Sequence, residues 1–273
     1  MVFAGIDVGS LTGKCVLLNN EEIIAHKVIR VRKTPVLTAE TVFNDVLKET
    51  HFERDTIDFI VSTGYGRDNI PFTDKSVTEI TCHGVGAHFL LSSVRTIIDI
   101  GGQDCKIIAV DRTGKLMDFY MNEKCSAGTG RYLEIMADLL DLSLTDLGKI
   151  SLKSKHPINI KSTCSIYAQA EVLQFISSGH KKANIAAGIN KAMAERVFSM
   201  AKRVKIKPDI VISGGVAKNI GVARHLEEMI TSKYISPSYT IKHNPFLKMP
   251  VDPQIIGALG AAVIAKERFE REN

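Results

Sequence analysis

Apolar positions along the chain form two kinds of pattern. Short apolar runs are typical of buried strands, and longer stretches with apolar residues at every third or fourth position are typical of amphipathic helices. The runs at residues 3–9 and 14–18 predict a first hairpin, and those at 95–100 and 106–110 predict a second. We therefore expect an α/β protein with two sheet-forming regions.

Helical spacing is clearest in four segments. Residues 38–50 carry apolar side chains along one face, and Thr38 is the expected N-cap. The same period predicts helices over residues 78–91 and 183–204, and a last helix over residues 254–269. Further strands are expected at residues 57–62, 209–212 and 239–242.

The two hairpins share a repeated motif. In each, an apolar strand ends in Asp-x-Gly, turns through small residues and resumes beside a lysine. Seven positions separate Asp7 from Lys14 and also Asp99 from Lys106, and the two copies lie 92 positions apart. Because internal repeats indicate duplicated structural units, we expect two homologous halves that face each other across a cleft.

The residue types in these turns suit nucleotide phosphates. Glycines allow close backbone approach, and successive N–H groups in a tight turn form an anion-binding concavity. Ser10, Thr12 and Lys14 add hydroxyl donors and a positive charge. The carboxylates of Asp7 and Asp104 are hard oxygen ligands that suit Mg²⁺ and its water molecules. A structural hairpin is the better explanation of a single turn of this kind, but two copies at matched spacing reverse that preference and favour phosphate binding.

A third glycine turn, Gly214-Gly215, joins the strand predicted at residues 209–212 to a following helix. By itself this pair is explained equally well by tight packing. As the third turn after two phosphate-type turns, it is suited to the adenosine of a nucleotide. The small residues at 257–262 favour a close helix crossing near a hinge.

Composition excludes several classes of protein. The 273 residues are 45% hydrophobic and 24% charged, which is typical of a soluble globular protein. The net charge of +5 is spread along the chain, so we expect no nucleic-acid partner. No secretory signal is apparent, and no apolar run reaches the ~18 residues of a membrane span. The five cysteines include no CxxC pair, which favours the cytoplasm over a disulfide framework.

The cysteines fall into two groups. Cys15, Cys82 and Cys105 lie in or beside apolar elements and are expected to be buried small hydrophobes. Cys125 and Cys164 each precede a helix within a small, polar segment, and a helix N-terminus lowers the pKa of a thiol. Two such cysteines from each of two chains would supply the four thiolates of an iron–sulfur cluster, although redox and purely structural roles remain alternatives.

The order of the segments resembles the actin, sugar-kinase and heat-shock-chaperone ATPase superfamily. The matching segments are a first phosphate turn, a connecting helix, a second phosphate turn, an adenosine Gly-Gly and a second connecting helix. This resemblance implies an α/β fold of two lobes, each with a mixed sheet flanked by helices, that close over Mg-ATP. The lobes would comprise residues 1–95 with 255–273, and residues 96–254.

A narrower resemblance rests on motifs that stand in order along nearly the whole chain. They look like those of the activator component of 2-hydroxyacyl-CoA dehydratases and of the related ATPase subunits of benzoyl-CoA reductase. The motifs are Asp7-Val8-Gly9-Ser10, Ser62-Thr63-Gly64-Tyr65-Gly66-Arg67, Asp99-Ile100-Gly101-Gly102-Gln103-Asp104, Lys124-Cys125-Ser126-Ala127-Gly128-Thr129-Gly130, Ser162-Thr163-Cys164 and Gly214-Gly215-Val216-Ala217.

The resemblance implies a homodimeric ATPase with one [4Fe-4S] cluster at its interface, ligated by Cys125 and Cys164. It also implies electron transfer from a ferredoxin or flavodoxin to a cluster-containing dehydratase or reductase. Asp7 and Asp104 would hold metal-bound water or orient the attacking water. The implied ATP contacts are Ser10, Leu11, Thr12, Gly13, Lys14, Gly101, Gly102, Gln103, Gly214, Gly215, Ala217, Lys218 and Gln254.

Two features depart from the family pattern, and two other functions remain open. Lys218 stands where a polar, uncharged residue is expected, and the segment at residues 233–251 is longer than in compact activators. A small-molecule kinase of the same superfamily would need an additional substrate pocket and a catalytic base. A filament or chaperone module would leave Cys125 and Cys164 unexplained.

Overall fold

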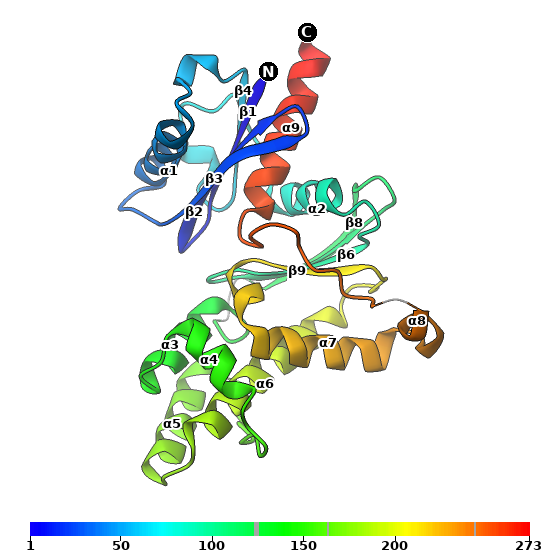
Figure 1. Ribbon diagram of the computed structural model, residues 1–273. Helices are drawn as coiled ribbons and strands as arrows, with labels where there is room; N and C mark the ends of the chain where they lie inside the picture. The colour runs from blue at the N-terminus through cyan, green and yellow to red at the C-terminus, as the bar shows by residue number, and fades with distance from the viewer. Residues whose placement is uncertain (123–125, 163, 243) are drawn as a thin grey trace. The chain divides into compact units, whose positions relative to one another are not determined.

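The computed structural model describes residues 1–122, 126–162, 164–242 and 244–273 (Figure 1). The chain forms two compact units. The first consists of Met1–Ile97, Ile108–Asp118 and Lys248–Asn273, and the second of Ile98–Ile107 and Phe119–Leu247. Within the described residues, no helix is both long enough and apolar enough to span a membrane.

A mixed five-stranded sheet forms the centre of the first unit, in the order β3-β2-β1-β4-β5. Strand β1 is antiparallel to β2 and parallel to β4, and all of its residues are buried. The strands are β1 (Val2–Val8), β2 (Thr12–Asn19), β3 (Glu22–Arg30), β4 (Phe59–Thr63) and β5 (Lys75–Ser76).

Helices cover both faces of this sheet, which explains why every residue of β1 is buried and why the strand is apolar apart from Asp7 (Figure 1). Alternate β1 residues such as Ala4 and Ile6 pack against α1 (Pro35–Thr50). Phe3 points to the other face and packs with α9 (Ile256–Glu272) and Cys82 of α2 (Glu79–Leu90). The first hairpin is therefore anchored by a fully buried strand, β1.

The four-stranded second sheet has the order β8-β7-β6-β9. Its strands are β6 (Thr96–Ile100), β7 (Cys105–Val110), β8 (Leu116–Asn122) and β9 (Ile210–Ser213). The order repeats that of β3-β2-β1-β4 in the first sheet, so the duplication extends over four strands. Both predicted hairpins are confirmed, as are the strands expected at residues 57–62 and 209–212.

The helices between β8 and residue 247 belong to the second unit. The described helices are α3 (Gly130–Leu139), α4 (Leu144–Ser151), α5 (Ser165–Ser177), α6 (Lys182–Ala201), α7 (Ile220–Tyr234) and α8 (Pro237–Lys242). Helix α6 packs against both α4 and α7. Asn190 of α6 is fully buried there, accepting a hydrogen bond from Asn219 and donating one to the carbonyl oxygen of Leu147.

Three predicted boundaries or elements are wrong. Helix α1 begins at Pro35 and is capped by Thr34, whose hydroxyl accepts from the N–H of Leu37, so its N-cap lies four residues before the predicted N-cap Thr38. The last helix begins at Ile256, not at residue 254. The expected strand at residues 239–242 belongs to helix α8, because Pro237 occupies the first helical position, where proline is favoured.

Candidate functional site

The first Asp-x-Gly turn encloses a buried ion pair. Asp7 and Lys14 are direct partners in the β1–β2 ladder, and Lys14 Nζ donates to Asp7 Oδ2 over 3.1 Å. The two side chains are only 6% and 12% exposed, respectively. The Gly9 N–H donates to the Thr12 carbonyl oxygen over 3.0 Å and closes the turn. The seven-residue spacing in the sequence is thus the length of one hairpin.

The second turn repeats this geometry with one difference. The Gly101 N–H donates to the Asp104 carbonyl oxygen over 3.0 Å, at the positions equivalent to Gly9 and Thr12. Lys106 Nζ lies 3.4 Å from Asp99 Oδ2 and 2.6 Å from Asp104 Oδ2. The Asp99 and Lys106 side chains are buried, whereas that of Asp104 is 28% exposed. Asp104 therefore combines an ion pair with access to solvent.

A glycine with positive φ packs against each Asp-x-Gly strand end. Gly64 follows β4 with φ +86°, and a Cβ atom there would overlap Asp7 Oδ1 and the Val8 carbonyl oxygen. Gly214 follows β9 with φ +81°, and a Cβ there would overlap the Ile100 carbonyl oxygen and lie 2.9 Å from Asp99 Oδ1. Gly64 therefore occupies the same position beside the first turn as Gly214 occupies beside the second.

The sequence interpretation missed this equivalence. It assigned Gly214 to the adenosine but gave Gly64 no role, although Thr63-Gly64 and Ser213-Gly214 both follow an apolar strand. Ser213 Oγ donates to Asp99 Oδ1 over 3.0 Å, so the second strand end also carries a hydroxyl contact. A search for small hydroxyl residues followed by glycine at strand ends would have found both positions.

The predicted adenosine segment forms a single tight turn. Residues Gly215–Lys218 make a short 3₁₀ helix in which Gly215 and Lys218 are exposed and Val216 is buried. Asn219 then caps α7, accepting from the N–H groups of Gly221 and Val222. Gly215, Ala217 and Lys218 thus remain accessible beside Gly214, which contacts the second phosphate-type turn.

The other predicted nucleotide residues lie in both units. In the first unit, the Gln254 N–H donates to Asp252 Oδ1 over 2.9 Å, just before α9. The remaining positions occupy the two turns and are partly accessible, apart from the buried Gly13. They are Ser10, Leu11, Thr12, Gly13, Gly101, Gly102 and Gln103.

The second turn is bonded directly to the start of helix α3. The N–H groups of Gly130 and Arg131 donate to the carbonyl oxygens of Gly101 and Gly102, each over 2.8 Å. Thr129 is buried, and its hydroxyl donates to the Ser126 carbonyl oxygen over 2.7 Å. A continuous set of hydrogen bonds therefore connects the candidate phosphate turn with the segment that follows Cys125.

The segments that carry the two candidate cluster ligands meet in the second unit. Cys164 is half-buried at the N-cap of α5, while Cys125 lies outside the described residues. Ser165 and Ser126 each directly follow one of these cysteines, and their hydroxyl oxygens are 3.0 Å apart. Positions 39 residues apart are thus brought into hydrogen-bond contact.

The other cysteines are buried, as predicted. Burial raises the pKa of the Cys82 thiol to about 12 and raises those of Cys15 and Cys105 further. All three side chains are fully enclosed within the chain, so none of them can reach a cluster shared between two copies. The cysteines available for a cluster are therefore Cys164 and, by its sequence context, Cys125.

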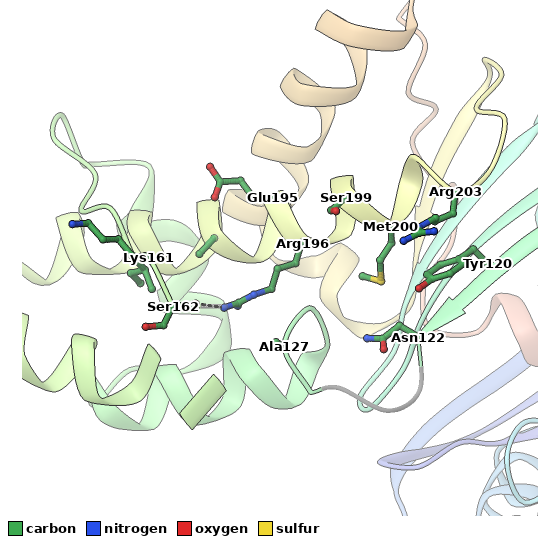
Figure 2. A pocket seen from close by; sticks show the side chains of 12 residues that line it. Tyr120, Asn122, Ala127, Lys161, Ser162, Glu195, Arg196, Ser199, Met200 and Arg203 are labelled. Carbon is green, nitrogen blue, oxygen red and sulfur yellow. Dashed lines mark hydrogen bonds between the residues drawn. The ribbon is translucent and has the colours of Figure 1, made fainter. Parts of the chain in front are cut away.

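A cavity of about 420 Å³ adjoins the cysteine segments (Figure 2). Ala127 and Ser162 line it together with Arg196 and Arg203, which approach from the side of α6. Arg196 Nη2 donates to the Ser162 carbonyl oxygen over 2.6 Å. Its Nη1 is buried and has no hydrogen-bond acceptor among the described residues. A buried guanidinium nitrogen without an acceptor would be stabilised by an anionic group nearby.

The model of the BadF/BadG/BcrA/BcrD ATPase family matches residues 4–265. This chain belongs to that ATPase family. Among curated members, it is 40% identical to the (R)-2-hydroxyglutaryl-CoA dehydratase activating ATPase of Acidaminococcus fermentans, over 97% of this chain and 96% of the relative. It is 39% identical to the 2-hydroxyisocaproyl-CoA dehydratase activator of Clostridioides difficile, over 97% and 95%, respectively.

Solved structures agree with the family assignment. The activator of 2-hydroxyisocaproyl-CoA dehydratase from Clostridium difficile with bound ADPNP matches with a TM-score of 0.91 and 37% identity, covering 100% of this chain and 97% of that one. A ROK family glucokinase from Streptomyces griseus matches with a TM-score of 0.51 and 12% identity, over 98% and 100%, which shows the fold alone. The predicted α/β fold shared with sugar kinases is thereby confirmed.

Proposed function

We propose that this ATPase is an electron activator that couples ATP hydrolysis to one-electron transfer, at low potential, to a 2-hydroxyacyl-CoA dehydratase or a related reductase. The activators named above support this proposal, as does the 29% identity, over 99% of this chain, to one of the subunits of benzoyl-CoA reductase from Thauera aromatica. The observation that carries it is the contact between Ser126 and Ser165, which joins the two cysteine segments.

The residues present suit a [4Fe-4S] cluster shared by two copies of the chain. Each copy would supply Cys125 and Cys164, which gives the four thiolates that such a cluster takes. The Nη1 of Arg196 beside the same segments is buried and has no acceptor in the part of the chain that the structure describes, which fits the negative charge of a thiolate-ligated cluster. When bound, the cluster would supply a site for a single electron at low potential.

The nucleotide would be held by the three glycine turns. Backbone N–H groups of residues 10–14 and of Gly102 and Gln103 would bind the phosphates, with the positive charges of Lys14 and Lys106 nearby. Asp7 and Asp104 would hold water molecules bound to Mg²⁺ or orient the attacking water. Gly214, Gly215, Ala217, Lys218 and Gln254 would contact the rest of the nucleotide.

Coupling between the two sites would follow the hydrogen bonds from the second turn to α3. A change in the backbone of Gly101 and Gly102 on hydrolysis would alter their hydrogen bonds with the N–H groups of Gly130 and Arg131. It would thereby shift the segment that follows Cys125. Reorienting a helix N-terminus changes the local positive potential at the thiolates. The electron donor would be a ferredoxin or flavodoxin, and the acceptor a cluster-containing partner enzyme.

Anaerobic isolation of the full chain tests this function. We expect a brown homodimer with four iron atoms per dimer and an ATPase activity that rises when a dehydratase partner is present. Cys125→Ala and Cys164→Ser should each remove the iron and the visible absorption while nucleotide binding persists. A colourless, iron-free monomer that hydrolyses ATP at full rate would contradict the proposal, and so would a Cys164→Ser variant that keeps its chromophore.

A further inference from the structure

We propose that Glu171 and Arg196 are positioning residues that fix the Cys164 loop, defined as residues 160–162, which precede Cys164 in the sequence. We also propose that Arg196 raises the reduction potential of the cluster through its charge. Both parts rest on the proposed cluster at Cys125 and Cys164. Neither residue belongs to the nucleotide turns or is a candidate ligand.

Glu171 ties the Cys164 loop to helix α5. Its Oε2 accepts from the N–H groups of Lys161 and Ser162 over 2.9 and 3.4 Å, and its Oε1 accepts from the Ser162 hydroxyl over 2.8 Å. Glu171 is seven residues after Cys164, which places it about two helical turns further along the same face. The carboxylate therefore fixes the backbone that enters Cys164 relative to the helix that leaves it.

Arg196 ties the same loop to two other helices. From α6 it donates to the Ser162 carbonyl oxygen, as Figure 2 shows, and its guanidinium lies over the Tyr132 ring at 4.7 Å from the ring centroid. Tyr132 is fully buried in α3, the helix that follows the Cys125 segment. One side chain thus contacts the loop before one cysteine and the helix after the other.

The charge of Arg196 is not balanced by a carboxylate within ion-pair distance among the described residues. The neighbouring Glu195 also lines the cavity, but its carboxylate is half-exposed and lies 3.9 Å from Lys191 Nζ. A fixed positive charge in a partly buried site stabilises the more negative state of a redox group. Since reduction adds one negative charge to the cluster, Arg196 should favour the reduced form and raise the potential.

Alkylation of the iron-free, reduced protein tests the positioning. Cys164 would be labelled with iodoacetamide, and the labelled peptide followed by mass spectrometry. We expect Glu171→Gln and Arg196→Lys to speed labelling of Cys164 at least about threefold, because each weakens the contacts that hold the loop. Glu195→Gln, a matched change on α6 that leaves these contacts intact, should label at the rate of the unmodified protein. Unchanged rates in both test variants would overturn the positioning role.

The potential of the cluster-loaded dimer tests the charge. Arg196→Gln keeps a donor for Ser162 but removes the charge, whereas Arg196→Lys keeps the charge. We expect Arg196→Gln to lower the midpoint potential by a tenfold change in the reduced-to-oxidised ratio, about 59 mV for one electron. Arg196→Lys should shift it by less than half as much. Equal potentials for the Gln variant and the unmodified protein would overturn the charge role.

Arg203→Gln is the control for charge, because Arg203 lines the same cavity without a bond to the Cys164 loop. The midpoint potential of the Arg203→Gln dimer should correspond to less than a twofold change in the reduced-to-oxidised ratio. A shift as large as that of Arg196→Gln would show a general effect of charge, and it would overturn the specific role of Arg196. An unmodified protein without iron would defeat the proposed function. The alkylation rates, measured without iron, would still decide whether Glu171 and Arg196 hold the loop.

Discussion

Lys106 lies between two carboxylates, and its second ion pair distinguishes the second phosphate-type turn from the first. Thr12 in the first turn is replaced by Asp104 in the second, so Lys106 pairs with Asp104 as well as with Asp99. The second turn therefore carries one more negative charge and one partly exposed carboxylate. This asymmetry makes Asp104 the better placed of the two candidate aspartates to meet a hydrated metal ion.

At the residue scale, Gly64 should tolerate no side chain. In Gly64→Ala, the Cβ would overlap Asp7 Oδ1 in addition to the strain of positive φ, so we expect a loss of at least about 3 kcal/mol in the free energy of unfolding. Gly179 has φ +74° with open space around it, so Gly179→Ala should lose only about 1 kcal/mol. Urea unfolding of both variants measures the difference, and equal losses would contradict the packing of Gly64 on Asp7.

At the element scale, helices α2 and α9 approach so closely that only glycine fits at the crossing. A Cβ at Gly260 would overlap the Cys82 carbonyl oxygen, and one at Gly86 would overlap that of Ile256. Alanine is favoured over glycine in a free helix by about 1 kcal/mol, which would stabilise the variant. Overpacking costs about 1–3 kcal/mol or more and should outweigh this gain.

Gly260→Ala should accordingly lower the thermal midpoint of unfolding by several degrees. The sign is the decisive result, because helix propensity and packing predict opposite changes. Differential scanning calorimetry measures the midpoint directly. A variant more stable than the unmodified protein would show that the two helices can separate without loss.

The hydrogen bonds between the second turn and α3 should affect the hydrogen–deuterium exchange of the amides that donate them. The Gly130 and Arg131 N–H groups donate to Gly101 and Gly102, so we expect nucleotide binding to slow the exchange of these two amides about tenfold. Hydrogen–deuterium exchange with and without ADP measures this. The capping amides of Gly221 and Val222, held by Asn219, provide an internal comparison within the same unit. Unchanged exchange at Gly130 and Arg131 would remove the proposed coupling route.

Hairpins were predictable from the sequence because they depend on local spacing. The interval from Asp7 to Lys14 is short enough that pattern and turn chemistry fix the pairing, and the ladder confirms it. The contact of Gly64 with Asp7 was not predictable in this way, because it depends on the pairing of β1 with β4, whose paired residues are 56 positions apart in the sequence. Likewise, Glu171 and Arg196 contact the Cys164 loop only through the packing of separate helices.

At the scale of the whole molecule, three buried thiols limit stability at alkaline pH. Burial raises the pKa of Cys82 to about 12 in the folded state and raises those of Cys15 and Cys105 as well. Above the ordinary thiol pKa, near 8.5, the unfolded chain loses a proton that the folded chain keeps. The free energy of unfolding should therefore fall as the pH rises from about 9 towards 12.

Each buried thiol should contribute a decrease of about 1 kcal/mol per pH unit in that range. Cys82→Ala should consequently show a shallower decrease between pH 9 and pH 10.5 than the unmodified protein, whatever its stability at pH 7.5. Urea unfolding at four pH values gives the slopes. Parallel slopes would mean that Cys82 ionises in the folded state.

The strand duplication described above has a consequence for the proposed redox function. Between the third and fourth strands of the repeat, the first copy uses residues 31–58 and the second uses residues 123–209. Both proposed iron ligands, Cys125 and Cys164, fall within that one longer crossover, as do Glu171 and Arg196. If the proposed function holds, an ancestral ATPase would need to lengthen only this single connection to acquire a cluster, and its two phosphate-type turns would be left as they were.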